Sequence, residues 1–158
     1  MCTFFVGDYM NLKYMDVAFQ EAMKAYKHAE VPVGAVIVKN DKIIAKSHNK
    51  KEKCRCALCH AEIFAIKKAS KRLKNWRLDG CDLYVTLEPC PMCASAIKQA
   101  RIKNVYSGLK NSDTNNNKII CEIFESDSTN PAVCFENDLY IEKSGTLLQK
   151  FFSERRKK

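Results

Sequence analysis

Residues 82–100 read DLYVTLEPCPMCASAIKQA, in which a strand pattern passes through a cysteine-containing turn directly into a helix pattern. The apolar and β-branched run over residues 82–87 is typical of a strand. Pro91 has a fixed backbone angle that suits the first turn of a helix, so the next helix is expected to start there. Cys90 and Cys93 stand three residues apart, a spacing that brings both thiols to one side of a helical turn. This stretch predicts a strand, two metal-ligating cysteines and a helix in continuous succession.

A second stretch, His60-Ala61-Glu62, opens another helix pattern upstream of the cysteines. Zinc is bound by imidazole and thiolate groups, and three protein ligands leave a fourth tetrahedral position for water, as in catalytic zinc sites. Zinc lowers the pKa of its water from about 16 toward about 7, so hydroxide becomes available near neutrality. Glu62 can take the proton of this water and pass it to a substrate nitrogen. We therefore expect His60, Cys90 and Cys93 to bind Zn²⁺ and Glu62 to be the catalytic residue.

The remaining chain alternates helix and strand patterns around these two stretches. Apolar spacings of three and four predict helices over residues 14–28, 61–73 and 91–100, and from a cap at Asn137 or Asp138 to the C-terminus. Strands are predicted over residues 33–38, 42–47, 82–87, 103–107 and 132–136, with the first two as a hairpin; residues 118–124 are predicted as a short helix or turn. The pattern indicates an α/β fold, a three-layer α/β/α sandwich with a central mixed sheet of about five strands.

Length and composition indicate one domain. The chain has 158 residues, of which 46% are apolar, and this suffices for a self-contained core. Residues 1–12 have no clear period and are expected to form an N-terminal extension before a single domain over residues 13–158. No stretch approaches the ~18 apolar residues of a membrane span, and an export signal is not recognisable, so a cytoplasmic protein without membrane contact is expected. The nine cysteines are then expected as reduced thiols and metal ligands.

The formal net charge is +9, from 27 basic and 18 acidic residues. Basic side chains that neutralise phosphates release condensed counterions, so this excess favours a polyanionic partner such as a nucleic acid. A basic surface that only keeps the protein in solution explains the charge equally well. Charge alone therefore leaves both interpretations open.

The two motifs, H-x-E and P-C-x-x-C, are the signature of zinc-dependent nucleobase deaminases. Further stretches resemble the bacterial tRNA-specific adenosine deaminases of this superfamily, namely Val31-Pro32-Val33-Gly34-Ala35, residues 57–66, residues 84–90, Phe151-Phe152 and Arg155-Arg156. The resemblance extends over residues 14–158. It implies a cytidine-deaminase-like fold and hydrolytic deamination of adenosine to inosine at the wobble position of a tRNA anticodon. It also implies a homodimer with one Zn²⁺ per chain and a tRNA anticodon stem-loop as partner.

The resemblance implies roles for residues outside the motifs as well. Asn49 stands eleven residues before the zinc histidine, where the family's asparagine hydrogen-bonds the purine, and Val31 would supply an apolar wall. Arg155 and Arg156 match a basic tail that meets nucleotides beside the target base. Each polar assignment has a structural alternative, because loop asparagines commonly cap backbone groups and basic residues at a helix C-terminus complement the helix dipole.

Two segments that border the expected substrate site depart from the resemblance. Residues 56–59 read CALC where relatives carry Asp-Pro-Thr-Ala. From the position of Gly108, relatives carry Gly-Ala-x-Asp-x-Lys-x-Gly-Ala, whereas residues 108–113 of this chain read GLKNSD and residues 111–117 form a polar, turn-rich segment. Cys56-x-x-Cys59-His60 also matches c-type haem attachment, although that interpretation leaves the other motif residues unexplained. Alternatively, Cys54, Cys56 and Cys59 could hold a second, structural zinc or be incidental thiols.

Two other functions share many of these features. A deaminase of free cytosine or guanine nucleosides or bases would use the same metal site, and activity on free nucleosides would distinguish it. A non-catalytic, zinc-stabilised RNA-binding protein would have no use for Glu62, and its metal would have four protein ligands.

Overall fold

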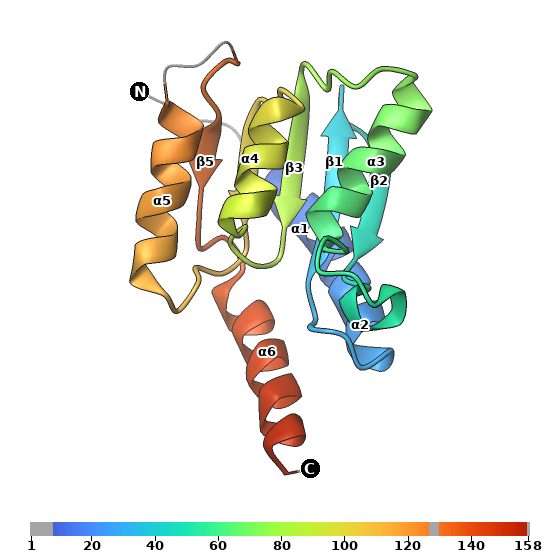
Figure 1. Cartoon of the computed structure of the whole chain (residues 1–158), viewed down its shortest axis with the longest axis vertical. Helices are drawn as coiled ribbons and strands as arrows, with labels where there is room; N and C mark the ends of the chain where they lie inside the picture. The colour runs from blue at the N-terminus through green and yellow to red at the C-terminus, as the bar shows by residue number, and fades with distance from the viewer. Residues whose placement is uncertain (1–7, 127–129, 158) are drawn as a thin grey trace.

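The computed structural model describes residues 8–126 and 130–157, with side chains from Leu12 onward. Within these residues, five strands form one sheet in the order β2-β1-β3-β4-β5 (Figure 1). The strands are β1 (Gly34–Lys39), β2 (Lys42–His48), β3 (Cys81–Val85), β4 (Asn104–Ser107) and β5 (Cys134–Glu136). β1 pairs antiparallel with β2 and β3, whereas β3, β4 and β5 are parallel. The predicted hairpin and mixed sheet are confirmed.

Helices cover both faces of this sheet (Figure 1). One face carries α1 (Asp8–Lys27), and the other carries α3 (Ala61–Leu73), α4 (Pro91–Gln99) and α5 (Thr114–Glu125). Successive strand residues point to opposite faces, so Val36 and Val38 pack with the α1 side while Ile37 packs with the α3 and α4 side. The predicted three-layer α/β/α sandwich is therefore confirmed. Within the described residues, no helix is long and apolar enough to cross a membrane.

Gly34, the first residue of β1, allows α1 to lie unusually close to the sheet. A Cβ atom at this position would lie 1.9 Å from the carbonyl oxygen of Ala18 and 2.6 Å from the amide nitrogen of Ala22. The Gly34 amide also donates to Thr86 Oγ1 at 3.1 Å, and the Thr86 amide donates to the Gly34 oxygen at 3.0 Å. This packing fixes the end of β3, which leads into the Pro89-Cys90 turn.

Helix α1 begins at Asp8 rather than at the predicted residue 14, so residues 8–12 are helical and not a patternless extension. Leu12 is 42% exposed and Lys13 is exposed, so the first two side chains that the structure describes in this helix lie outside the packed face. The remainder of the predicted extension, residues 1–7, lies outside the described residues.

Helix α5 begins at Thr114, inside the segment predicted as a loop over residues 111–117. The Asp113 carboxylate accepts a hydrogen bond from the Asn115 amide at 3.0 Å and caps the helix, so the second half of the asparagine run is helical. The structure also contains a four-residue helix, α2 (Lys51–Cys54), that was not predicted.

Helix α6 (Ile141–Arg156) begins at a later residue than it would if Asn137 or Asp138 capped its N-terminus. Asn137 Nδ2 donates to Glu88 Oε2 at 2.6 Å, and Asp138 Oδ1 accepts from the Lys110 amide at 2.9 Å. The prediction of either residue as the cap is wrong because both side chains are held by distant partners.

Candidate active site

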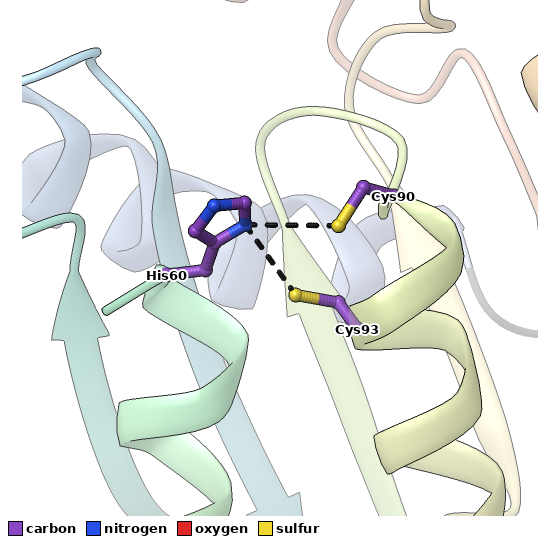
Figure 2. A group of neighbouring side chains, drawn as sticks. All are labelled: His60, Cys90 and Cys93. Carbon is purple, nitrogen blue, oxygen red and sulfur yellow. Dashed lines mark hydrogen bonds between the residues drawn. The ribbon is translucent and has the colours of Figure 1, made fainter. Parts of the chain in front are cut away.

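His60, Cys90 and Cys93 come together at the start of two neighbouring helices (Figure 2). His60 immediately precedes α3, Cys90 immediately precedes α4, and Cys93 lies in the first turn of α4 behind Pro91. His60 Nδ1 lies 3.7 Å from Cys90 Sγ and 3.6 Å from Cys93 Sγ. All three ligand atoms lie within 4.8 Å of one another.

These distances fit a tetrahedral zinc ion. Zinc–nitrogen bonds of ~2.05 Å and zinc–sulfur bonds of ~2.3 Å at a tetrahedral angle place nitrogen and sulfur about 3.6 Å apart. The predicted ligand set is therefore brought together with the spacing that the ion requires. Among the described residues this group has three members, so it leaves a coordination position for water or substrate.

The electrostatics of the two cysteines suit metal binding. Hydrogen bonds from the Cys93 thiol and the His60 ring lower the pKa of Cys90 to about 4, although burial opposes this shift. The pKa of Cys93, in contrast, is raised by its hydrogen bond with Cys90 and by burial. Without a cation the pair therefore shares one negative charge, and a divalent cation would take both sulfurs as thiolates.

Glu62, the second residue of α3, lies beside this metal group. It is only 4% exposed, and its carboxylate is hydrogen-bonded to the Cys93 thiol. Burial raises the pKa of this carboxyl group to about 7. The structure thus places a nearly water-free carboxyl group next to the ligands, where it can hold or release a proton.

Asn49 connects the end of β2 to the start of α3. Its side-chain Oδ1 accepts a hydrogen bond from the Ala61 backbone amide at 2.9 Å. The backbone amide of Asn49 donates to the Val33 oxygen at 3.1 Å. The side chain therefore satisfies one of the free amides at the N-terminus of α3, next to His60. This is a structural role of the kind expected for a loop asparagine, and contact with a purine stays a prediction.

A groove of about 960 Å³ runs along α6, and Val31 is one of its lining residues. Its other walls come from Leu87 near the metal turn, from residues 109–112 and from α6, including Leu148, Phe152 and Arg156. The two arginines predicted to contact RNA, Arg155 and Arg156, therefore lie in different surroundings. Arg156 lines the groove, whereas Arg155 donates to the Ala29 oxygen at 2.6 Å and lies 4.8 Å from the centre of the Phe151 ring.

Glu88 supports the metal turn and was not predicted as a site residue. This carboxylate is only 2% exposed and accepts hydrogen bonds from Asn116 Nδ2 at 2.7 Å, Asn137 Nδ2 at 2.6 Å and Asn117 Nδ2 at 3.3 Å. It ties the Pro89-Cys90 turn to α5 and to the segment before α6. A buried carboxylate needs such donors, but in the sequence Asn116 and Asn117 looked like turn residues and Asn137 like a helix cap.

Comparison with known proteins agrees with this geometry. Residues 9–109 match the family model described as the cytidine and deoxycytidylate deaminase zinc-binding region. The chain belongs to this family of zinc-dependent hydrolytic deaminases, which confirms the predicted enzyme class and the zinc cofactor. The orientation of His60 toward Cys90 and Cys93 does not fit the alternative of haem attachment.

Within the superfamily, the chain is similar to tRNA-specific adenosine deaminases. That of Bacillus subtilis (strain 168) is 40% identical over 92% of this chain and 90% of its own length; that of Aquifex aeolicus (strain VF5) is 39% identical over 90% and 94%. A solved structure from a study of A-to-I editing by tRNA:A34 deaminases superimposes with a TM-score of 0.79 at 36% identity, covering 87% of this chain and 99% of that one. Guanine deaminase from Bacillus subtilis gives a TM-score of 0.62 at 31% identity over 92% and 93%. The predicted resemblance to the tRNA enzymes is confirmed.

Proposed function

We propose that this protein converts the wobble adenosine of a tRNA anticodon to inosine by hydrolysis. The observation that carries the proposal is the buried Glu62 carboxyl group beside the three-ligand metal group. Relatives named for this reaction match more than nine tenths of the chain, and this supports RNA over a free base as substrate. The names of these relatives also support tRNA rather than DNA as the substrate.

The reaction replaces the 6-amino group of adenine by oxygen, with water consumed and ammonia released. Zinc bound by His60, Cys90 and Cys93 would supply Lewis acidity that makes its water acidic near neutrality. Glu62 would accept one proton of the attacking water and deliver it to N1 of the ring, and would then pass the second proton, from the new C6 hydroxyl, to the departing amine. The amide of Asn49 would orient the purine, and Val31 would provide an apolar wall beside it.

The RNA would lie along α6. A base in an anticodon loop is already unpaired, so drawing it out of the loop costs little. The groove that Arg156 lines is large enough for nucleotides next to the target base, and the net charge of +9 favours a phosphate backbone.

We further propose a homodimer that acts in the cytoplasm, where such an RNA substrate is found. Support for the dimer comes from the resemblance and from large apolar side chains at the surface, of which Leu58 is 58% and Ile119 is 42% exposed. Light scattering on the zinc-loaded protein measures the mass directly, and a monomer would contradict the dimer.

The decisive experiment compares substrates for the zinc-loaded protein. Unmodified tRNA, an anticodon stem-loop, free adenosine, free cytidine and free guanine are incubated in parallel, and the products are identified by mass spectrometry after nuclease digestion. Inosine should form in the tRNA and the stem-loop, at a rate that falls steeply with salt because phosphate contacts are screened. Equal activity on free adenosine, or uridine or xanthine as the main product, would overturn the assignment to tRNA.

A further inference from the structure

Three cysteine thiols gather on the loop that precedes His60, outside the metal group described above. Cys54 and Cys56 are exposed and Cys59 is partly buried. The Cys56 amide donates to the Lys51 oxygen at 3.2 Å, and the thiols of Cys54 and Cys56 are the neighbours that act electrostatically on the Cys59 thiol. Cysteine is among the most often buried residue types, so two exposed cysteines that face a third require an explanation.

The backbone holds the first of these cysteines in place. Cys54 is the last residue of α2, whose amides at Glu52 and Lys53 donate to the buried Glu30 carboxylate at 3.0 and 2.8 Å. Arg55 then adopts a left-handed conformation with φ of 50°, which reverses the chain. The backbone after this reversal lies against α2, where the Arg55 amide donates to the Glu52 oxygen at 3.1 Å.

The other two cysteines belong to a closed turn. The Cys59 amide donates to the Cys56 oxygen at 3.2 Å, and the Lys50 amide donates to the Cys59 oxygen at 3.0 Å. The loop from Lys50 to Cys59 is thus closed by backbone bonds before any thiol is engaged. A closed loop lowers the entropy cost of gathering ligands around an ion.

We propose that Cys54, Cys56 and Cys59 bind a second Zn²⁺ ion, with solvent in the fourth position. Thiolates select soft or borderline cations, and clustered cysteines that do not form a disulfide framework are typical of metal-binding segments. In the part of the chain that the structure describes, the ligand atoms of His60, Cys90 and Cys93 all lie within 4.8 Å of one another, whereas the three sulfur atoms of this trio do not. Binding therefore requires side-chain rotation, which exposed cysteines undergo between staggered rotamers at little cost.

The second ion would act on the loop beside the substrate. His60 follows Cys59 directly, and the Asn49 side chain holds the Ala61 amide at 2.9 Å. An ion that joins α2 to the turn at Cys56 and Cys59 would stiffen the segment between Asn49 and His60. The proposal does not depend on which base the enzyme deaminates.

The test counts metal ions in the full-length protein. Protein is loaded with zinc in the presence of a phosphine reductant, freed of unbound metal by gel filtration and analysed by elemental mass spectrometry. The wild type should retain about two zinc ions per chain, and a variant with Cys54→Ser, Cys56→Ser and Cys59→Ser about one. The matched control, Cys121→Ser with Cys134→Ser, should retain both ions. One ion in the wild type would overturn the proposal.

A second measurement keeps the test valid if the triple variant does not fold. Wild-type protein is alkylated with iodoacetamide with and without zinc, and modified cysteines are mapped by peptide mass spectrometry. Zinc should protect Cys54, Cys56 and Cys59 by at least tenfold, while the exposed Cys134 reacts equally in both samples. Unprotected cysteines in the trio, or a disulfide among them in the purified protein, would overturn the proposal.

Discussion

The region that holds the chemistry and the region that lines the groove are built differently. In the catalytic region, residues 8–107, buried side chains at the ends of packed strands and helices hold the metal ligands and Glu62. In the C-terminal region, residues 108–157, partly or fully exposed side chains of residues 109–112 and α6 form most of the groove wall. The family model ends at residue 109, near the boundary between the two. Packing thus constrains the reaction, whereas the groove side chains can change at little cost to stability.

The largest effect should come from Glu62→Gln in the catalytic region. The amide keeps the size of the side chain but cannot carry the proton, so turnover should fall by roughly 10²- to 10⁴-fold. Zinc content should stay that of the wild type, because Glu62 is not one of the ligands. Glu122→Gln on the exposed face of α5 is the control and should leave turnover unchanged. More than a tenth of wild-type turnover in Glu62→Gln would contradict the proton-transfer role.

The same glycine substitution should have opposite effects in the two regions. Gly34→Ala places a Cβ atom 1.9 Å from the Ala18 oxygen, so unfolding free energy should fall by about 3 kcal/mol or more. Gly145→Ala places it 4.0 Å from Leu109 Cδ1, within a helix, and should stabilise the protein by up to ~1 kcal/mol. Urea unfolding at fixed zinc concentration measures both. Equal effects would show that the catalytic region is not the more tightly packed of the two.

Two neighbouring arginines of α6 test which groups meet RNA. Arg156→Ala should weaken binding of an anticodon stem-loop roughly tenfold and reduce the salt slope by about one phosphate contact, because Arg156 lines the groove. Arg155→Ala should leave binding nearly unchanged and lower stability by about 1 kcal/mol, because it removes the bond to the Ala29 oxygen. Fluorescence anisotropy at several salt concentrations measures binding. The reverse order of effects would place the RNA on the other side of α6.

The smallest effect concerns stability in acid. Burial alone would raise the pKa of Glu21, but hydrogen bonds from His48 and Lys24 outweigh it and lower the pKa. A carboxyl group whose folded pKa lies below its unfolded value stabilises the protein above the unfolded pKa and loses that contribution as pH falls through the folded pKa. Glu21→Gln should therefore flatten the decrease in unfolding free energy from about pH 5 to about pH 3.

The matched control for this acid effect is Asp16→Asn, which removes a 3.5 Å ion pair with Lys143 between two half-exposed side chains and keeps an oxygen that can accept from the Tyr140 hydroxyl. Exposed pairs contribute little, so its pH profile should follow the wild type. If Asp16→Asn flattens the profile as much as Glu21→Gln does, the surface contact between the two regions is stronger than its exposure indicates.

Local signals explain why the sequence predicted the catalytic region well. The proline of the Cys90-Pro91 junction marks a helix start, and the ligand types of His60 and Cys93 identify a metal without knowledge of the fold. The C-terminal region depends on distant partners instead. Asn137 satisfies the local pattern of a helix cap but is bound by Glu88. Which of Arg155 and Arg156 would face the groove was also unpredictable, because it depends on how α6 rotates against its neighbours.

The hydrogen bond between the Asn49 side chain and the Ala61 amide has a consequence for base selectivity. The Ala61 amide occupies one of the two acceptor positions of the oxygen, and the two hydrogens of the carboxamide would be the donors offered to a bound ring. Adenine and guanine both present the ring acceptor N7, so donation from Asn49 to N7 would hold either purine equally well. Discrimination between the two bases would then depend on contacts elsewhere around the ring, where adenine carries its amine at C6 and guanine carries an oxygen at C6 and its amine at C2.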